Sequence, residues 1–332
     1  MRNGLPDIED VVDAARRLRG KAVVTPLLRA PALDRIAGGT LLIKAEPLQR
    51  TGSFKFRGAY NRISRIPEEE RSRGVVSWSS GNHAQGVAAA AGLLGIPATI
   101  VMPSDAPAPK LDNTRALGAE VVLYDRYAES REDIGTRIAE QRGATIIKPY
   151  DDPWIIAGQG TVGLEAAGQA LAAGLSPDHA LVACSGGGLV SGTAIALTDH
   201  LPGITVHSVE PEGFDDTARS LAAGARLAND PAARSICDAL LAPTPGELTF
   251  EINRRLLGPG IVVSDADARA AMRAAFRHLR LVAEPGGALP LAAALSGRFD
   301  CRGKCVLVVV SGGNVAPELF AETLLAGEDP GG

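Results

Sequence analysis

Short apolar runs recur along this chain, and between most of them Ala and Leu recur at helical spacing. The runs have the length of buried strands, and the segments between them have the length of helices. Alternation of this kind predicts an α/β fold in which parallel sheets are flanked by helices. The predicted strands are 40–46, 74–80, 98–103, 120–125, 145–150, 179–185, 204–210 and 304–313, and the clearest helical patterns are 83–95 and 271–284.

Two turns rich in Pro and acidic residues interrupt the alternation. They are "RIPEEE", near residue 67, and "PYDDP", near residue 151. A length of 332 residues is also that of about two domains. We therefore predict a discontinuous larger domain, residues 1–66 and 151–332, and a smaller domain, residues 67–150.

Charge and composition exclude several kinds of partner. The net charge is −4 and no basic block is present, so neither nucleic acid nor an anionic membrane is an expected partner. The N-terminal stretch predicts an amphipathic helix rather than a signal peptide, and no apolar run is long enough to span a bilayer. The acidic, Gly-rich tail from residue 326 is expected to fray. Four cysteines are too few for a disulfide framework, so a reducing cytoplasm is the expected location.

Three Gly-rich segments follow predicted strands: "SSGNHAQG" (79–86), "CSGGGLVSG" (184–192) and "SGGNV" (311–315). Ligands of α/β folds bind where strands end and helices begin, so the three segments are expected to converge on one anionic ligand. The run "SGGGL" is the clearest phosphate signal, because glycines have no Cβ and let their amides approach phosphate oxygens. No Gly-Lys-Ser/Thr follows, which excludes a Walker A loop. A tight turn without a ligand is the alternative.

The segment "QRTGSFKFRGAY" (49–60) places a cation at a helix start. Lys55 follows the capping turn "TGS" and lies in the first helical turn between two Phe rings. Helix N-termini favour acidic residues, so this position and the apolar rings should lower the pKa of the amine. A neutral amine is a nucleophile, and beside a phosphate site it predicts a Schiff base with pyridoxal phosphate. The alternative is an ordinary surface lysine.

Several segments resemble, in the same order, the motifs of the threonine dehydratase and serine racemase family. They are "SFKFRGA", "SSGNHAQGVA", "VMPSDAPAPKLDNTRALGAEVVLY", "IAGQGTVGLE", "CSGGGL" and "SGGNV", and the resemblance runs from about residue 8 to residue 318. It implies a two-domain fold type II pyridoxal-phosphate enzyme, similar to the β subunit of tryptophan synthase. The large domain would bind the cofactor, the small domain would lie on the substrate side, and a homodimer is expected. No regulatory extension follows "SGGNV", which is typical of the catabolic type.

The resemblance also implies roles for individual residues. Lys55 would hold the cofactor and then act as the base at the α-carbon. Ser311 would face the pyridine nitrogen, and backbone amides at a helix start would hold the substrate carboxylate. The implied cofactor-binding residues are Phe54, Lys55, Asn82, Gly186, Gly187, Gly188, Leu189 and Ser311, and the implied carboxylate-binding residues are Ser79, Ser80, Gly81, Asn82 and His83. For His83, a cap of its own helix is the alternative.

A serine at position 311 favours one reaction type. Its hydroxyl would leave the pyridine largely neutral and the cofactor a weaker electron sink. Loss of a β-hydroxyl tolerates this, because the leaving group carries the electrons away. We therefore expect water to leave a β-hydroxy-α-amino acid of the threonine or serine type, giving a 2-oxo acid and ammonia. Ser80 occupies the position of a serine that serves family racemases as a second-face acid, so serine or aspartate racemisation is the alternative, and a non-catalytic amino-acid sensor is a third reading.

The substrate side departs from the family pattern. Tyr150 stands where relatives often have Phe or Asn, and Ala239 stands where they commonly have Gly. Arg131, in "ESRED", resembles a racemase arginine that reaches a dicarboxylate ligand, although an exposed helix Arg is an equal reading. The substrate therefore stays open among threonine, serine, 3-hydroxyaspartate, phenylserine and an intermediate of hydroxyectoine breakdown.

An acidic loop, "EPEGFDD" (210–216), is the expected metal site. Glu210 and Asp216 supply hard oxygen ligands, and the carbonyl of Phe214 can be a third. The resemblance implies Mg²⁺ or Ca²⁺ here, close to the active site. A solvated acidic loop is the alternative.

Overall fold

The structure is a computed structural model that describes residue 1, residues 4–106 and residues 108–327. Its helices are α1 Ile8–Leu18, α2 Pro31–Ala37, α3 Lys55–Ile63, α4 Asn82–Leu94, α5 Ala108–Ala116, α6 Arg131–Arg142, α7 Pro153–Ala172, α8 Gly188–His200, α9 Asp216–Ala223, α10 Glu247–Leu256, α11 Asp265–Ala274, α12 Pro285–Leu295 and α13 Pro317–Leu325. Its strands are β1 Leu27–Leu28, β2 Thr40–Ala45, β3 Val75–Trp78, β4 Ala98–Pro103, β5 Glu120–Tyr124, β6 Thr145–Ile146, β7 His179–Ala183, β8 Thr205–Pro211, β9 Ile261–Val263 and β10 Cys305–Val310.

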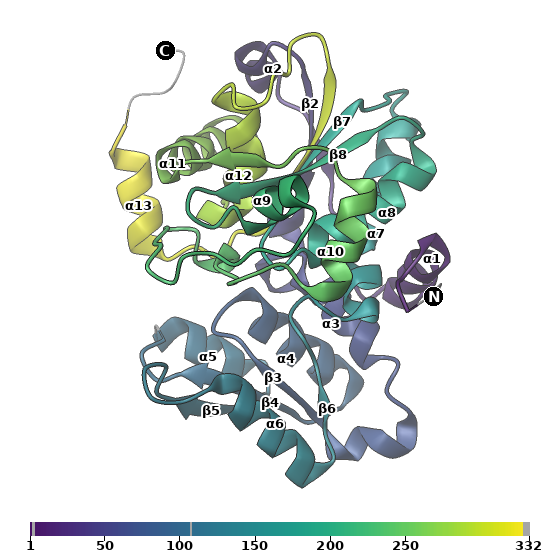
Figure 1. The fold of residues 1–332 in the computed structure, drawn as a ribbon, viewed down its shortest axis with the longest axis vertical. Coiled ribbons are helices and arrows are strands. Elements are labelled where there is room, and N and C mark those ends of the chain that lie inside the picture. Colours follow the sequence, from purple (N-terminus) through teal and green to yellow (C-terminus); the bar gives the residue numbers. More distant parts are fainter. Residues whose placement is uncertain (2–3, 107, 328–332) are drawn as a thin grey trace.

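Two separate sheets organise the chain (Figure 1). The larger has the strand order β1-β2-β10-β7-β8-β9 and is parallel except for β1, which pairs antiparallel with β2. The smaller has the order β5-β4-β3-β6 and is parallel throughout. The predicted α/β fold with parallel sheets is confirmed.

Both faces of the larger sheet are covered by helices. Successive side chains of a strand point to opposite faces, and in β10 Val308 packs into a core with α11 and α12, whereas Leu307 and Val309 pack into a core with α7 and α8. This double burial explains the uninterrupted apolar run of β10.

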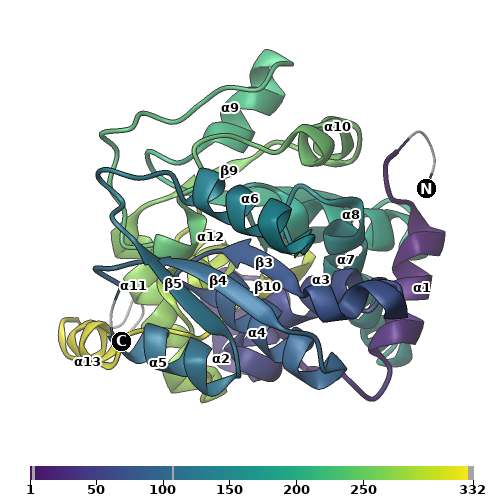
Figure 2. The ribbon, with the colours of Figure 1, turned by 90° about the horizontal axis from the view of Figure 1, so that it is seen from below.

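The smaller sheet is also covered on both faces. Helices α4 and α5 lie on one face and α6 lies on the other (Figure 2). Its first and last strands, β3 and β6, are neighbours, with Val75 opposite Thr145. All four of its strands come from between residues 67 and 151, but those two domain boundaries themselves stay predictions.

Three expectations about individual elements were wrong or incomplete. The strand predicted at 145–150 ends at Ile146, and the chain turns towards Pro149, which lacks the N–H that a ladder needs. The helical pattern predicted to 284 ends earlier: after α11 one π-helical turn, Ala275–Leu279, leads to Arg280 in the left-handed region. The short strands β1 and β9 were not predicted.

The N-terminal amphipathic helix is confirmed as α1. A capping box between Asp7 and Asp10 starts it, and Arg16 and Arg17 lie in its last turn, as the helix dipole favours. No helix of the described residues is long and apolar enough to cross a membrane. The tail expected to fray falls mostly on residues 328–332, which lie outside the described residues.

Helix α3 is held from behind by a buried ion network. Arg57 donates to Glu46 through Nε and Nη2 at 2.8 Å each, and to Glu165 through Nη1 at 2.8 Å and Nη2 at 2.9 Å. Lys44 on β2 donates to Glu165 at 2.8 Å. The side chains of Arg57, Glu46 and Lys44 are fully buried. The network therefore ties α3 to β2 and to α7.

We predict that Arg57→Met lowers the free energy of unfolding by about 3–5 kcal/mol, because Glu46 would lose its buried counter-charge and Glu165 would keep only that of Lys44. Urea denaturation followed by circular dichroism measures this. Arg115→Met is the control, since Arg115 forms only an exposed ion pair with Asp112 and such pairs contribute little. Equal effects of the two substitutions would contradict the role given to the network.

Candidate functional site

A cavity of about 370 Å³ lies between the two sheets, where their strands end and helices begin. Its walls come from the segments that follow β3, β7 and β10 and from the start of α3, so the three Gly-rich segments do converge. All the residues predicted to bind cofactor or substrate line it: Phe54, Lys55, Ser79, Ser80, Gly81, Asn82, His83, Arg131, Tyr150, Gly186, Gly187, Gly188, Leu189 and Ser311.

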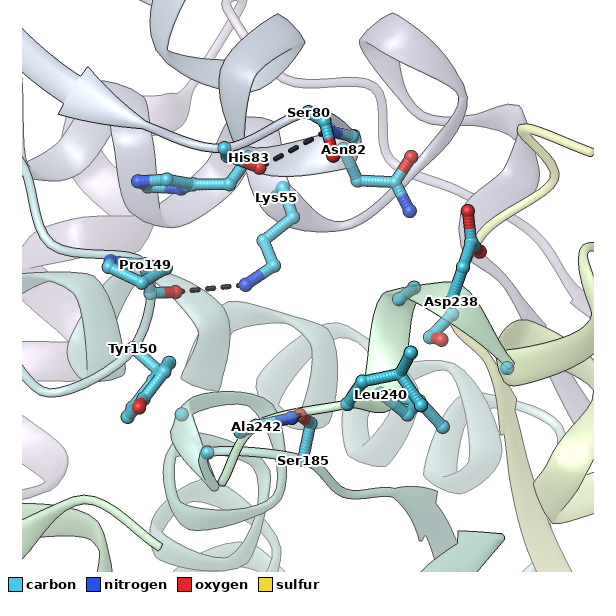
Figure 3. Close-up of a pocket in the computed structure, with 18 of the residues that line it drawn as sticks. Lys55, Ser80, Asn82, His83, Pro149, Tyr150, Ser185, Asp238, Leu240 and Ala242 are labelled. Atoms are coloured by element: carbon cyan, nitrogen blue, oxygen red, sulfur yellow. Dashed lines mark hydrogen bonds between the residues drawn. The ribbon is translucent and has the colours of Figure 1, made fainter. Parts of the chain in front are cut away.

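Lys55 extends into this cavity from the first turn of α3 (Figure 3). Its amine donates to the carbonyl of Pro149 at 2.9 Å and lies 5.3 Å from the centre of the Phe54 ring. Burial lowers the pKa of the amine to about 8, and the charge of Glu284 opposes that shift. Near neutral pH a larger fraction of this amine is therefore neutral and nucleophilic than of an ordinary lysine.

The turn before α8 forms a cradle for an anion. Gly187, at φ +99°, precedes the helix and provides no side-chain cap, which leaves first-turn N–H groups for a ligand. A Cβ on Gly186 would lie 2.4 Å from the Tyr150 ring, and one on Gly187 would lie 2.7 Å from the Cβ of Thr249. Only glycine fits both positions. The cradle and the amine share one cavity, so the residues present fit pyridoxal phosphate.

Helix α10 supports this cradle from outside. Thr249 donates its hydroxyl to the carbonyl of Gly186 at 2.7 Å. Helix α10 has no cap of its own, and instead Asp151 accepts from the N–H groups of Glu247 at 3.2 Å and Leu248 at 2.9 Å. Asp151 directly follows Tyr150, whose ring lies beside Gly186. One turn of chain therefore contacts both the cradle and the helix that supports it. Sequence reasoning missed this role of Asp151, because its partners are almost a hundred residues away.

Asn82 is held between two side chains. Its amide nitrogen donates to Glu284 at 2.6 Å, and its amide oxygen accepts from Asn314 at 2.7 Å. The second N–H of the amide has no acceptor among the described residues and can donate to a ligand, as the predicted role of Asn82 requires. Burial and the charge of Asp238 raise the pKa of Glu284 to about 7. Sequence reasoning missed Glu284 as a cavity residue, although a lone acid in the apolar stretch around "LVAEPGGALPL" was an available signal.

The start of α4 presents backbone N–H groups to the cavity. Gly81 is its N-cap residue without a side-chain cap, and its own N–H donates to the Ser79 hydroxyl at 3.2 Å. His83 does not cap its own helix: its Nε2 lies 3.1 Å from the carbonyl oxygen of Ile147. Burial lowers the pKa of His83 to about 3, with a further contribution from Lys55, so the ring is neutral. A neutral ring and free amides are compatible with the predicted carboxylate site.

The remaining predicted residues lie around these groups. Phe54 donates its N–H to the carbonyl of Ser311 at 3.1 Å, which joins the lysine segment to the end of β10. Arg131 begins α6 on the small-domain wall. Ala239 also lines the cavity, in the short helical turn Asp238–Leu240. The individual cofactor and substrate roles stay predictions.

Glu210, Phe214 and Asp216 lie outside the cavity lining. Both carboxylate oxygens of Glu210 accept from backbone N–H groups of α9, at 2.9 and 2.8 Å. Asp216 accepts from Asn229 at 2.6 Å, while its other oxygen is buried and has no hydrogen-bond partner among the described residues. The described residues contain no group of three or more His, Cys, Asp or Glu that could hold a metal. The orphaned oxygen is compatible with a cation, and Mg²⁺ or Ca²⁺ stays a prediction that calorimetric titration can decide.

Comparison with known proteins agrees with this geometry. The family described as "Pyridoxal-phosphate dependent enzyme" matches residues 19–312. An L-threo-3-hydroxyaspartate ammonia-lyase of Pseudomonas is 46% identical over 96% of this chain and 99% of its own. One of Saccharomyces cerevisiae is 40% identical over 98% of each chain. The solved structure of maize serine racemase superposes with a TM-score of 0.90, at 39% identity over 97% of each chain.

We predict that Asp151→Ala weakens the binding of pyridoxal phosphate roughly 5- to 10-fold, because loss of a helix cap of about 1 kcal/mol would loosen the support of the cradle. Fluorescence titration of the cofactor-free protein measures the affinity. Asp151→Asn keeps a hydrogen-bond acceptor and should retain most of the affinity for the cofactor.

Ser264→Ala is the matched control, because Ser264 caps α11 in the same way but does not contact the cradle. It should lower stability and leave the cofactor affinity unchanged. If both alanine variants bind the cofactor equally well, Asp151 does not position the cradle.

Proposed function

The chain belongs to the pyridoxal-phosphate-dependent enzymes, and within them we propose an ammonia-lyase that removes water from a β-hydroxy-α-amino acid. The enamine product would hydrolyse to a 2-oxo acid and ammonia. The observation that supports this most directly is the amine of Lys55, with its pKa lowered to about 8, in one cavity with the glycine cradle.

The chain supplies the groups that such a reaction needs. Pyridoxal phosphate, when bound, supplies an electron sink for the electron pair left at the α-carbon. Lys55 would hold the cofactor and take the α-proton, since a pKa lowered to about 8 lets its amine accept and release a proton more readily near neutral pH. The N–H groups at the start of α4 would hold the α-carboxylate in the helix dipole. Asn82, fixed by Glu284 and Asn314, would orient the ring.

For the substrate we propose L-threo-3-hydroxyaspartate as the first choice. Two relatives at 46% and 40% identity are named for this activity. Arg131 on the small-domain wall supports it, because guanidinium groups bind carboxylates through paired N–H donors. The net reaction would convert 3-hydroxyaspartate to oxaloacetate and ammonia, the water lost in elimination being returned in hydrolysis.

The test is release of 2-oxo acid and ammonia from L-threo-3-hydroxyaspartate, L-threonine, L-serine and phenylserine by the purified holoenzyme. We expect 3-hydroxyaspartate to have the highest kcat/KM. Lys55→Ala should remove the visible absorbance of bound pyridoxal phosphate and lower turnover at least about 10²-fold, because the proton-transfer group is lost. Lys148→Ala, an exposed neighbour of the Pro149 turn, is the control. Full activity of Lys55→Ala would refute the assignment.

Racemisation is the second candidate function. It needs a proton donor at the second face of the α-carbon, and the hydroxyl of Ser80 lines the cavity. Maize serine racemase, which superposes along nearly the whole chain, also supports it.

We predict that Ser80→Ala abolishes D-serine formation from L-serine, because it removes the proposed second-face donor, whereas dehydration of L-substrates survives. Chiral chromatography of the serine that remains after incubation measures this. Ser79→Ala, which removes the adjacent hydroxyl at the carboxylate site, is the comparison: it should raise KM for serine but still form D-serine. Equal D-serine production by wild type and Ser80→Ala would make Ser80 a binding group only.

Two broader expectations remain proposals. The four cysteines are free thiols and three of them are buried, which supports a reducing compartment such as the cytoplasm. A homodimer follows from the family resemblance alone, and sedimentation velocity would decide it.

A further inference from the structure

A small annex opens from the main cavity at the carboxyl ends of β3, β4 and β5. It has a volume of about 60 Å³ and is lined by Ser79, Ser80, Val101, Pro103, Tyr124, Arg126 and Arg131. Four of these residues, Ser79, Ser80, Arg126 and Arg131, also line the main cavity, so the two spaces adjoin each other. The annex therefore begins directly beside the predicted site of the α-carboxylate.

The charged side chains that line this annex are all positive. Two guanidinium groups line it, and no acidic side chain is among its lining residues. The two acids of the main cavity are engaged elsewhere, Asp238 with Lys110 at 2.7 Å and Glu284 with Asn82 at 2.6 Å. Two positively charged groups that line one small space together attract an anion to it. The annex is thus suited to a negatively charged group.

Each arginine is held from outside the annex and keeps donors for a ligand. Arg126 contacts the carboxylate of Asp105 through Nε at 2.9 Å and Nη2 at 2.7 Å. Arg131 contacts Glu132 through Nε at 2.9 Å. Neither acid lines the annex. Within the part of the chain that the structure describes, Nη1 of Arg126 and both terminal nitrogens of Arg131 have no hydrogen-bond partner.

The backbone around both arginines is well fixed. Arg126 lies in a turn closed by the N–H of Glu129, which donates to the carbonyl of Asp125 at 2.8 Å. Arg131 is one turn from Gly135 in α6, and a Cβ on Gly135 would lie 2.4 Å from the Trp78 ring. Trp78 is the last residue of β3, directly before Ser79. The distance between Arg131 and the α-carboxylate site is therefore set by packing.

From this geometry we infer that Arg126, together with Arg131, binds the second carboxylate of a dicarboxylic β-hydroxy amino acid, and that Arg126 determines specificity for it. This inference rests on the proposed function, because it places the α-carboxylate at the start of α4. Substrates with a methyl or hydrogen at the same carbon would make no use of the remaining N–H donors of the two arginines and gain no affinity from them.

The test compares Arg126→Met with wild type as holoenzymes. We expect kcat/KM for L-threo-3-hydroxyaspartate to fall roughly 10- to 150-fold, the range for one charge-assisted hydrogen bond, while kcat/KM for L-threonine stays within about threefold. Calorimetry with malonate, an unreactive dicarboxylate, should show a similar loss of affinity. Arg126→Lys keeps the positive charge but lacks the planar guanidinium group. It should recover part of the kcat/KM for 3-hydroxyaspartate and part of the affinity for malonate.

Two controls separate binding from structure. Arg115→Met removes another arginine of the small domain, which pairs with Asp112 away from the cavity. It should change neither kcat/KM for the two substrates nor the affinity for malonate. Asp105→Asn removes the same ion pair as Arg126→Met but leaves the guanidinium, so it should retain the preference for 3-hydroxyaspartate. Loss of that preference in Asp105→Asn but not in Arg126→Met would overturn the inference.

The outcomes also distinguish this inference from the proposed function. Equal losses for threonine and hydroxyaspartate in Arg126→Met would overturn the role of Arg126. Turnover of threonine or serine by wild type, without hydroxyaspartate turnover or malonate binding, would overturn the subsite and leave the lyase proposal intact. Malonate binding that depends on Arg126, without turnover of any β-hydroxy amino acid, would support the subsite and overturn the proposed function.

Discussion

The buried ion network around Arg57 is the constraint on which the geometry of the site depends. Arg57 lies two residues after Lys55, so whatever fixes its guanidinium also fixes the first turn of α3. Its partners Glu46 and Glu165 come from outside α3, the first after β2 and the second from α7. Buried charges are tolerated only while every partner is in place. The network therefore admits one position of α3, and the amine projects from it towards the glycine cradle.

The features that could be predicted from the sequence are those whose cause lies in neighbouring residues. The α/β fold followed from the length and spacing of apolar runs. Lys55 could be identified because a cation at a helix start contradicts the local electrostatic preference. Gly186 could be identified because a glycine run directly after a strand is typical of a phosphate-binding turn. These residues do lie in one cavity. Boundaries were less accurate where the apolar pattern continued past a residue, such as Pro149, that ends a strand.

Contacts between residues far apart in the chain could not be predicted. Asn82 and Glu284 are 202 positions apart, and Asp151 caps a helix 97 positions away. Hydrophobic period and propensity are local quantities, and they contain no information about which polar side chains meet after folding. Arg126 illustrates this limit: in sequence it is one more charged residue in a turn, and only the packing of β4, β5 and α6 places it beside Ser80.

The pairing of β3 with β6 has a mechanical consequence. The segment that forms the smaller sheet enters through one of these strands and leaves through the other, and the two are neighbours. A body that is connected through two adjacent strands can undergo a hinge rotation in which only the segments flanking those strands change conformation. Its own sheet would stay intact. The arginines lie on this body, whereas the glycine cradle lies on the other. Such a rotation would change the span between them, which is the span that a bound substrate has to fill.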